Sequence, residues 1–99
     1  MIVLRSSYTA PLEEVNKHVA AHREWLGQLV AEGVVIAGGR MDPPTGAGII
    51  GAGLDAASFL ERFNTEDPYA IAGVAKYELV LAFAAGSANE VVKALDEGA

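Results

Sequence analysis

The chain of 99 residues is 52% hydrophobic, contains no cysteine and carries a formal net charge of −6 at pH 7. This charge argues against nucleic acid and anionic membranes as partners, which require clustered Lys and Arg, and the lack of cysteine excludes disulfides, thiolate nucleophiles and cysteine-ligated metals. We expect a single soluble domain over residues 1–99, located in the cytoplasm, because the sequence shows neither a signal peptide nor a membrane span.

The first third of the chain predicts a strand followed by a long helix. Residues 1–8 are apolar and β-branched at their start, which is typical of a strand. We expect a helix from there to residue 32, with Thr9 as its N-cap, Pro11 in its first turn and Gly33 as its C-terminal stop.

Beyond Gly33 the sequence predicts three more strands and two more helices. Short apolar runs predict strands at 34–37, which Gly38-Gly39 closes, at 47–54 and at 77–83. Asp55 is a good N-cap for a helix that ends near residue 64, before Pro68 breaks the helical geometry. The capping-box pattern Ser87-Ala88-Asn89-Glu90 predicts a short C-terminal helix to about residue 96.

This order of elements is β-α-β-β-α-β with a terminal helix, which is the order of a ferredoxin-like α+β fold. Both helices of such a fold cover one face of an antiparallel sheet, and the other face normally alternates polar with apolar residues. Residues 34–37 and 78–83 are instead apolar at nearly every position. We therefore expect a homodimer in which the two sheets pack together and close toward a barrel.

His22 lies where the helical pattern requires an apolar residue. Val15, Val19, Leu26 and Leu29 share one helical face at about 100° per residue, and His22 falls in the middle of that face. An unsatisfied polar group in a core costs about 1–3 kcal/mol. The fold should therefore provide a polar partner for the imidazole.

Asp67 is the candidate for that partner. A carboxylate on one ring nitrogen fixes the tautomer and raises the basicity of the other nitrogen, which suits proton transfer near neutral pH. Two simpler interpretations stay open: Asp67 caps a turn that begins at Pro68, and His22 is a core histidine with satisfied hydrogen bonds. A metal site of His18, His22 and Asp67 is conceivable, but our prediction includes no metal and no cofactor.

Several short motifs together resemble the YciI-like (YCII-related) family over residues 2–83; they are His22-Arg23-Glu24-Trp25-Leu26, Gly33, Gly38-Gly39, Asp67-Pro68-Tyr69 and Gly73. The resemblance implies a ferredoxin-like fold that dimerises as an α/β barrel, and an active-site dyad at His22 and Asp67. Some family members are linked to the dehydrochlorination of chlorinated hydroxyhydroquinones. Arg40 departs from the family, whose members often have Pro there. It either favours an anion in the pocket or is a solvated hairpin residue.

The predicted function is that of a small enzyme of the isomerase or lyase type that transfers a proton on a small cyclic or aromatic molecule. His22 and Asp67 are its catalytic residues, and Arg40, Trp25 and Tyr69 are expected to contact the substrate. The alternative is a non-catalytic dimer that binds a small ligand or a protein. The interpretation of Trp25 and Tyr69 as packing residues also stays open. A buried titratable pair beside a pocket favours the enzyme, because proton transfer requires such a pair and a binding module does not.

Overall fold

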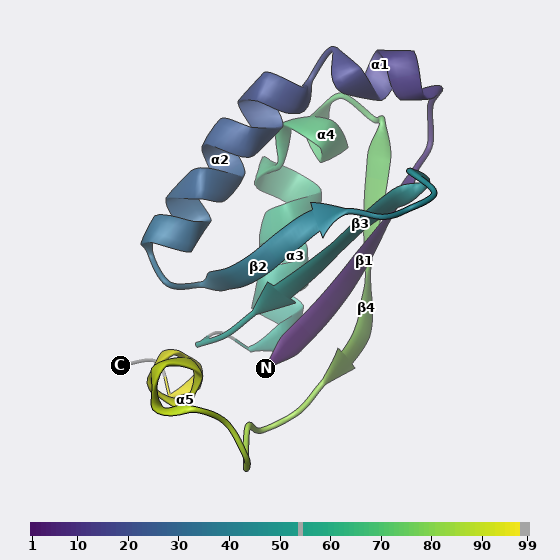
Figure 1. Ribbon diagram of the computed structural model, residues 1–99. Helices are drawn as coiled ribbons and strands as arrows, with labels where there is room; N and C mark the ends of the chain where they lie inside the picture. The colour runs from purple at the N-terminus through teal and green to yellow at the C-terminus, as the bar shows by residue number, and fades with distance from the viewer. Residues whose placement is uncertain (54, 98–99) are drawn as a thin grey trace.

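The computed structural model describes residues 1–53 and 55–97, and its elements follow the predicted ferredoxin-like order (Figure 1). They are β1 (Ile2–Tyr8), α1 (Leu12–Asn16), α2 (Val19–Ala31), β2 (Val35–Arg40), β3 (Gly46–Gly51), α3 (Ala56–Glu66), α4 (Pro68–Ile71), β4 (Ala75–Ala82) and α5 (Glu90–Asp96). The strands form one antiparallel sheet in the order β2-β3-β1-β4. The predicted α+β fold is confirmed. No helix within the described ranges is long and apolar enough to cross a membrane.

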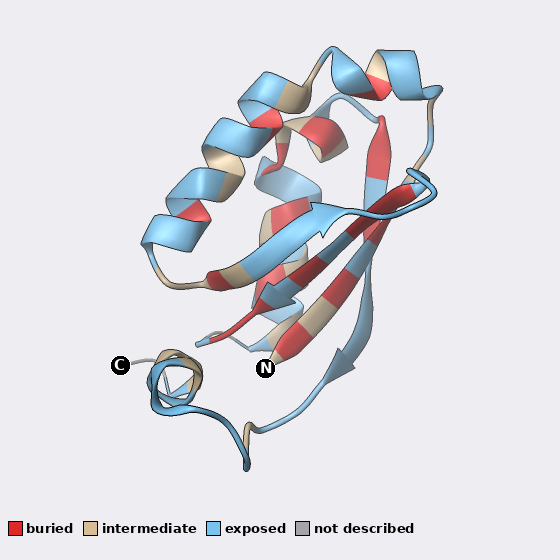
Figure 2. Ribbon diagram, viewed as in Figure 1, coloured by how far each residue is buried: buried red, intermediate tan, exposed pale blue. Residues whose placement is uncertain are grey.

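The main core lies between the sheet and the helices α2 and α3. Alternate residues of β1 point into it, so Leu4 and Ser6 are buried whereas Arg5 is exposed (Figure 2). Leu29 from α2 and two phenylalanines from α3 complete the same apolar cluster. Burial of this surface is the main favourable term in folding. It places both helices on one face of the sheet.

The prediction of one helix as far as residue 32 is wrong, because the segment forms two helices. His18, between α1 and α2, leaves helical geometry at φ −110° and ψ 5°. Thr9 is not the N-cap; its hydroxyl donates to the carbonyl of Gly73 at 2.8 Å, and Pro11 occupies the cap position. The break lets Val15 join a second apolar cluster, around Tyr69, which is separate from the main core.

Other element ends differ from the prediction where tertiary contacts decide them. β2 continues through Gly38 and Gly39 to Arg40, because its backbone hydrogen bonds to β3 require no side chain. The N-cap of α5 is Asn89 and not Ser87, since the Asn89 amide oxygen accepts from the Val92 amide at 3.0 Å. The predicted cap of α3 is confirmed: Asp55 accepts from the Ser58 amide at 2.9 Å. The predicted strand end at Leu54, and residues 98–99 of the predicted domain, lie outside the described residues.

The sheet face opposite the helices is exposed in the single chain. Register pairs place four apolar residues in one row across all four strands; they are Ala37, Ile50, Val3 and Leu81. Ile50 is 39% exposed and Leu81 is 47% exposed. In the next row Arg5 and Glu78 form an ion pair of 2.6 Å. We call this surface the open sheet face.

Gly46 is the position in the hairpin where a side chain is least tolerable. A Cβ atom on Gly46 would overlap the main-chain carbonyl of Ser6, whereas a Cβ on Gly39 would meet nothing within 4 Å. We expect Gly46→Ala to lower the free energy of unfolding by about 2 kcal/mol or more, as overpacking against backbone does, and Gly39→Ala to change it by less than about 1 kcal/mol. Urea denaturation of both variants measures this. Equal stability of the two variants would contradict the close approach of β1 and β3 here.

Candidate active site

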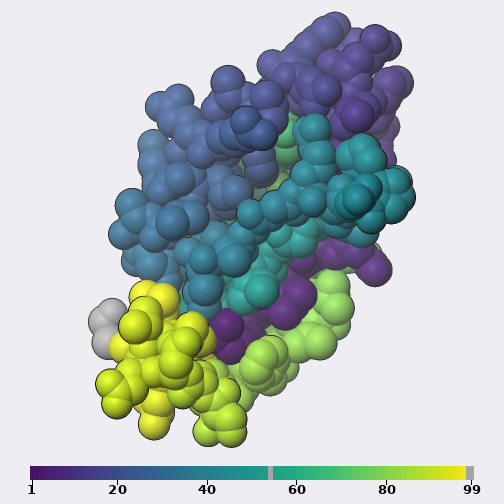
Figure 3. Space-filling model, in the orientation of Figure 1, coloured from purple at the N-terminus to yellow at the C-terminus, as the bar shows by residue number. Residues whose placement is uncertain are grey.

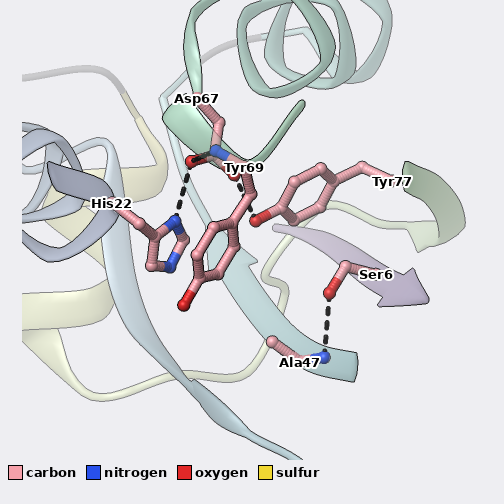
Figure 4. Close-up of polar contacts among 6 residues, drawn as sticks. All are labelled: Ser6, His22, Ala47, Asp67, Tyr69 and Tyr77. Atoms are coloured by element: carbon pink, nitrogen blue, oxygen red, sulfur yellow. Dashed lines mark hydrogen bonds and ion pairs between the residues drawn. The ribbon is translucent and has the colours of Figure 1, made fainter. Parts of the chain in front are cut away.

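His22 points from α2 toward the start of α4, where its Nδ1 lies 2.7 Å from Oδ1 of Asp67 (Figure 4). The predicted contact between these two side chains is therefore present. The side chain of His22 is 10% exposed and that of Asp67 is fully buried. When the imidazole is neutral, this contact favours the tautomer in which Nδ1 donates to the carboxylate and Nε2 carries the lone pair.

Asp67 lies at the junction of α3 and α4. Pro68 disfavours helical geometry at the preceding residue, so the backbone of Asp67 is extended, with φ −64° and ψ 127°. Its Oδ1 also accepts a hydrogen bond of 3.1 Å from the Tyr69 amide and so caps α4. Capping the turn and holding the histidine were alternative interpretations of Asp67. In the structure one carboxylate oxygen does both.

Tyr77 of β4 is the third donor to Asp67, and it is not among the site residues predicted from the sequence. Its hydroxyl donates to Oδ2 of Asp67 at 2.6 Å. Burial, together with the adjacent carboxylate, holds the pKa of the Tyr77 hydroxyl far above its ordinary value. The sequence did contain a signal, because Tyr77 begins the strand predicted at 77–83 and a buried phenol needs a hydrogen-bond partner.

The ring of Tyr69 stacks on one face of the His22 imidazole. The ring centroids of His22 and Tyr69 are 3.9 Å apart and their planes differ by 6°. Burial raises the pKa of the Tyr69 hydroxyl, and the nearby Arg40 guanidinium opposes this shift. The stacking restricts rotation of the imidazole. The face of the phenol also attracts the imidazolium form when His22 is protonated.

A pocket of about 230 Å³ opens beside His22. The hollow is visible in Figure 3 between the blue residues of α2 and the teal residues of β2. Within the described residues, every buried side-chain nitrogen has a hydrogen-bond partner. Nε2 of His22 has no such partner among them, so it is not buried. Because His22 lines the pocket, Nε2 is accessible from there. The polar side chains that line the pocket are Tyr8, His22, Arg23, Arg40 and Tyr69, and the larger apolar ones are Val19, Leu26 and Ile49.

Arg40 lies at the end of β2 and lines this pocket. Its Nε donates to the Tyr8 hydroxyl at 2.9 Å, and its Nη2 donates to the Asn16 amide oxygen at 2.9 Å. Its Cζ is 5.5 Å from the centroid of the Tyr8 ring. The hydrogen bond with Tyr8 raises the pKa of Arg40. Although the residue is exposed, three contacts hold the guanidinium in place.

The structure does not bring Trp25 to the pocket. Its ring packs edge-on against Phe63 at a centroid distance of 5.0 Å, beside the main core. His18 does not join a metal site either. Within residues 1–53 and 55–97, no three His, Asp or Glu side chains gather in a group that could hold a metal ion.

Comparisons with known proteins agree with this architecture. A family model described as a YCII-related domain matches residues 1–83. Among solved structures, the chain is similar to the 5-chloro-2-hydroxyhydroquinone dehydrochlorinase of Burkholderia phenoliruptrix, in a complex with 2,5-dihydroxybenzoquinone. The two chains are 24% identical with a TM-score of 0.61, over 79% of this chain and 91% of the other, which shows a shared fold. No curated protein matches the chain.

Tyr77→Phe removes one donor from the buried carboxylate and keeps the ring. We expect the free energy of unfolding at pH 7 to fall by about 1–3 kcal/mol, the cost of a buried unsatisfied group. Because folding raises the pKa of Tyr77, its stabilisation is complete below the unfolded pKa of about 10 and is lost as the pH rises above that value. Urea denaturation should therefore show the difference between wild type and variant shrinking above about pH 10.

Tyr8→Phe is the control for this variant, because it removes a phenol hydroxyl that is not bonded to the carboxylate. We expect it to lower stability by less than Tyr77→Phe does. Equal losses in the two variants, or a loss from Tyr77→Phe that does not depend on alkaline pH, would contradict the assigned hydrogen bond.

Proposed function

Because this chain belongs to the YCII-related domain family, we propose that it is a small enzyme that transfers a proton on a small cyclic or aromatic molecule. His22 is the general acid-base, and Asp67 orients it. The observation that carries the proposal is the position of the imidazole, which has Nδ1 on a buried carboxylate and Nε2 accessible from a pocket. A histidine that only filled the core would have no need of this asymmetry.

In the proposed reaction Nε2 of His22 removes a proton from a ring carbon next to an oxygen-bearing carbon. The C–H bond breaks, an N–H bond forms, and the electron pair moves into the ring toward the oxygen. Return of the proton to another carbon gives an isomerisation. Departure of a group such as chloride with its electron pair gives an elimination, and the proton and charge balance in both. Asp67 stabilises the imidazolium through Nδ1–H.

The size of the pocket supports a single-ring substrate, because a cavity of about 150 Å³ is enough to hold benzene and this one is about 230 Å³. The solved relative is a dehydrochlorinase of a hydroxyhydroquinone and was captured with a dihydroxybenzoquinone. We propose a substrate of that ring class here, contacted by Arg40 and Tyr69. We propose further that residues 1–99 act as one domain in the cytoplasm.

We also propose that the active species is a homodimer joined through the open sheet face. Ala37, Ile50, Val3 and Leu81 form an apolar row across the whole sheet. Burying such a row against a second copy removes apolar area from water, which stabilises association by about 25 cal/mol per Å² before the entropy cost of binding. A two-fold axis would place each row against the other.

Removal of the dyad should abolish turnover without unfolding the protein. We expect His22→Ala and Asp67→Asn each to lower kcat/KM by about 100-fold or more, the usual contribution of positioned acid-base catalysis. Chloride release from 5-chloro-2-hydroxyhydroquinone measures the elimination. Loss of ring C–H signals from hydroxylated rings in D₂O measures the proton transfer of the isomerisation.

His18→Ala is the matched control, because His18, the other histidine of the chain, does not line the pocket. This variant should retain full activity. Circular dichroism checks that each variant is folded. Activity that survives His22→Ala, or a wild-type protein that is inactive in both assays, would leave the non-catalytic binding dimer as the better interpretation.

Ile50→Glu should dissociate the proposed dimer, because it places a charge in the middle of the apolar row. Sedimentation equilibrium at micromolar concentration should show wild type at twice the chain mass and the variant at the chain mass. Ile71→Glu is the control: Ile71 is 71% exposed on α4 and lies outside the sheet. A monomeric wild type would refute the dimer.

A further inference from the structure

The four arginines of the chain fall into two groups. Arg5 pairs with Glu78 at 2.6 Å, and Arg62 approaches Glu32 at 3.7 Å and Glu66 at 3.6 Å. Arg23 and Arg40, which line the pocket, form no ion pair among the described residues. In a chain with 13 acidic and 7 basic residues, carboxylate partners are plentiful. The two arginines that line the pocket therefore lack the carboxylate partners that the other two arginines have.

The lining of the pocket strengthens this contrast. Of the described residues that line it, none is Asp or Glu. The carboxylate of Asp67, which contacts His22, is fully buried, and its oxygens accept from three donors. The charged side chains that line the pocket are therefore arginines, although the chain carries a net charge of −6.

Arg40 is held in one orientation before any ligand arrives. Both of its protein acceptors, the Tyr8 hydroxyl and the Asn16 amide, are uncharged. They use Nε and one hydrogen of Nη2, so Nη1 and the second hydrogen of Nη2 stay available for a ligand. A guanidinium fixed by neutral partners keeps its full charge and loses little side-chain entropy when it binds an anion.

The remaining walls of the pocket suit a flat ring. Gly38 lines the pocket, and a Cβ there would lie 2.9 Å from Cδ1 of Ile49 and 3.7 Å from Cδ2 of Leu26. The missing side chain leaves a narrow space between these two apolar groups. An apolar slot with charged groups at its side orients a planar ligand by its polar substituent.

We propose that the ligand of this pocket is a planar cyclic monoanion with its charge on an oxygen, and that the Arg40 guanidinium binds that oxygen. The inference rests on the proposed function for the identity of the site and adds the charge state of the substrate. Tyr8 and Asn16 are positioning residues that hold Arg40. During proton removal by His22, the electron pair that leaves the C–H bond moves to a carbonyl oxygen of the ring other than the one that Arg40 binds, because the bound oxygen already carries a negative charge.

The experiment compares two probes of similar size, 4-nitrophenol and 4-nitroanisole, which has no ionisable proton. Wild-type protein should bind 4-nitrophenolate, and the absorbance of the bound probe should show that it ionises at a lower pH than in water. Arg40→Gln should weaken phenolate binding about tenfold or more and remove the shift in ionisation. It should leave the affinity for 4-nitroanisole unchanged.

Two further variants test whether phenolate binding depends on the pocket itself. Arg62→Gln changes the net charge by the same amount outside the pocket and should leave phenolate binding unchanged. Gly38→Val fills the slot and should weaken both probes. The proposal is overturned if wild type does not bind the phenolate, if Arg40→Gln binds it as wild type does, or if Arg62→Gln weakens it equally.

These outcomes are independent of the proposed acid-base chemistry, because the binding assay follows no proton transfer by His22. Phenolate selectivity in a protein that is inactive in the chloride and exchange assays would refute the proposed function and support the anion site. Turnover without phenolate selectivity would support the proposed function and refute the anion site.

Discussion

The buried carboxylate of Asp67 is the constraint on which the rest of the site depends. A carboxylate without partners in a core is very costly, and proteins tolerate one only where hydrogen bonds satisfy its oxygens. Here the donors come from three elements: His22 from α2, the Tyr69 amide from α4 and Tyr77 from β4. The same hydrogen bonds that satisfy the carboxylate therefore fix both helices relative to the sheet, so the orientation of His22 and the stability of the fold depend on one network.

The network makes the two nitrogens of His22 different. One is committed to a carboxylate in the interior, and the other is accessible from a pocket between α2 and β2. Tyr69 contributes twice, through its amide on Asp67 and its ring on the imidazole. Changes in the turn at Pro68 would thus alter the position of the carboxylate and the orientation of the histidine together.

Two adjacent glycines of β2, Gly38 and Gly39, lie on opposite faces of the sheet. Gly38 pairs with Ile49 on the helix side and keeps the pocket open, whereas Gly39 pairs with Gly48 beside the Arg5–Glu78 row of the open sheet face. Successive residues of a strand point to opposite sides. The Gly-Gly pair therefore leaves space on both sides of the strand, toward the pocket on one side and on the open sheet face on the other.

The sequence by itself determined the order of the elements, the α+β class, the Asp55 cap and the inward phase of His22, because hydrophobic periodicity and capping are local properties. It also singled out Asp67, since a buried imidazole needs a partner and Pro68 ends the helix beside it. Tertiary structure alone decided the break at His18, the extension of β2 through its glycines, the packing of Trp25 on Phe63 and the hydrogen-bond partners of Tyr77 and Arg40. These depend on which residues far apart in the chain meet. Strand register and helix placement set those meetings, and no local pattern encodes them.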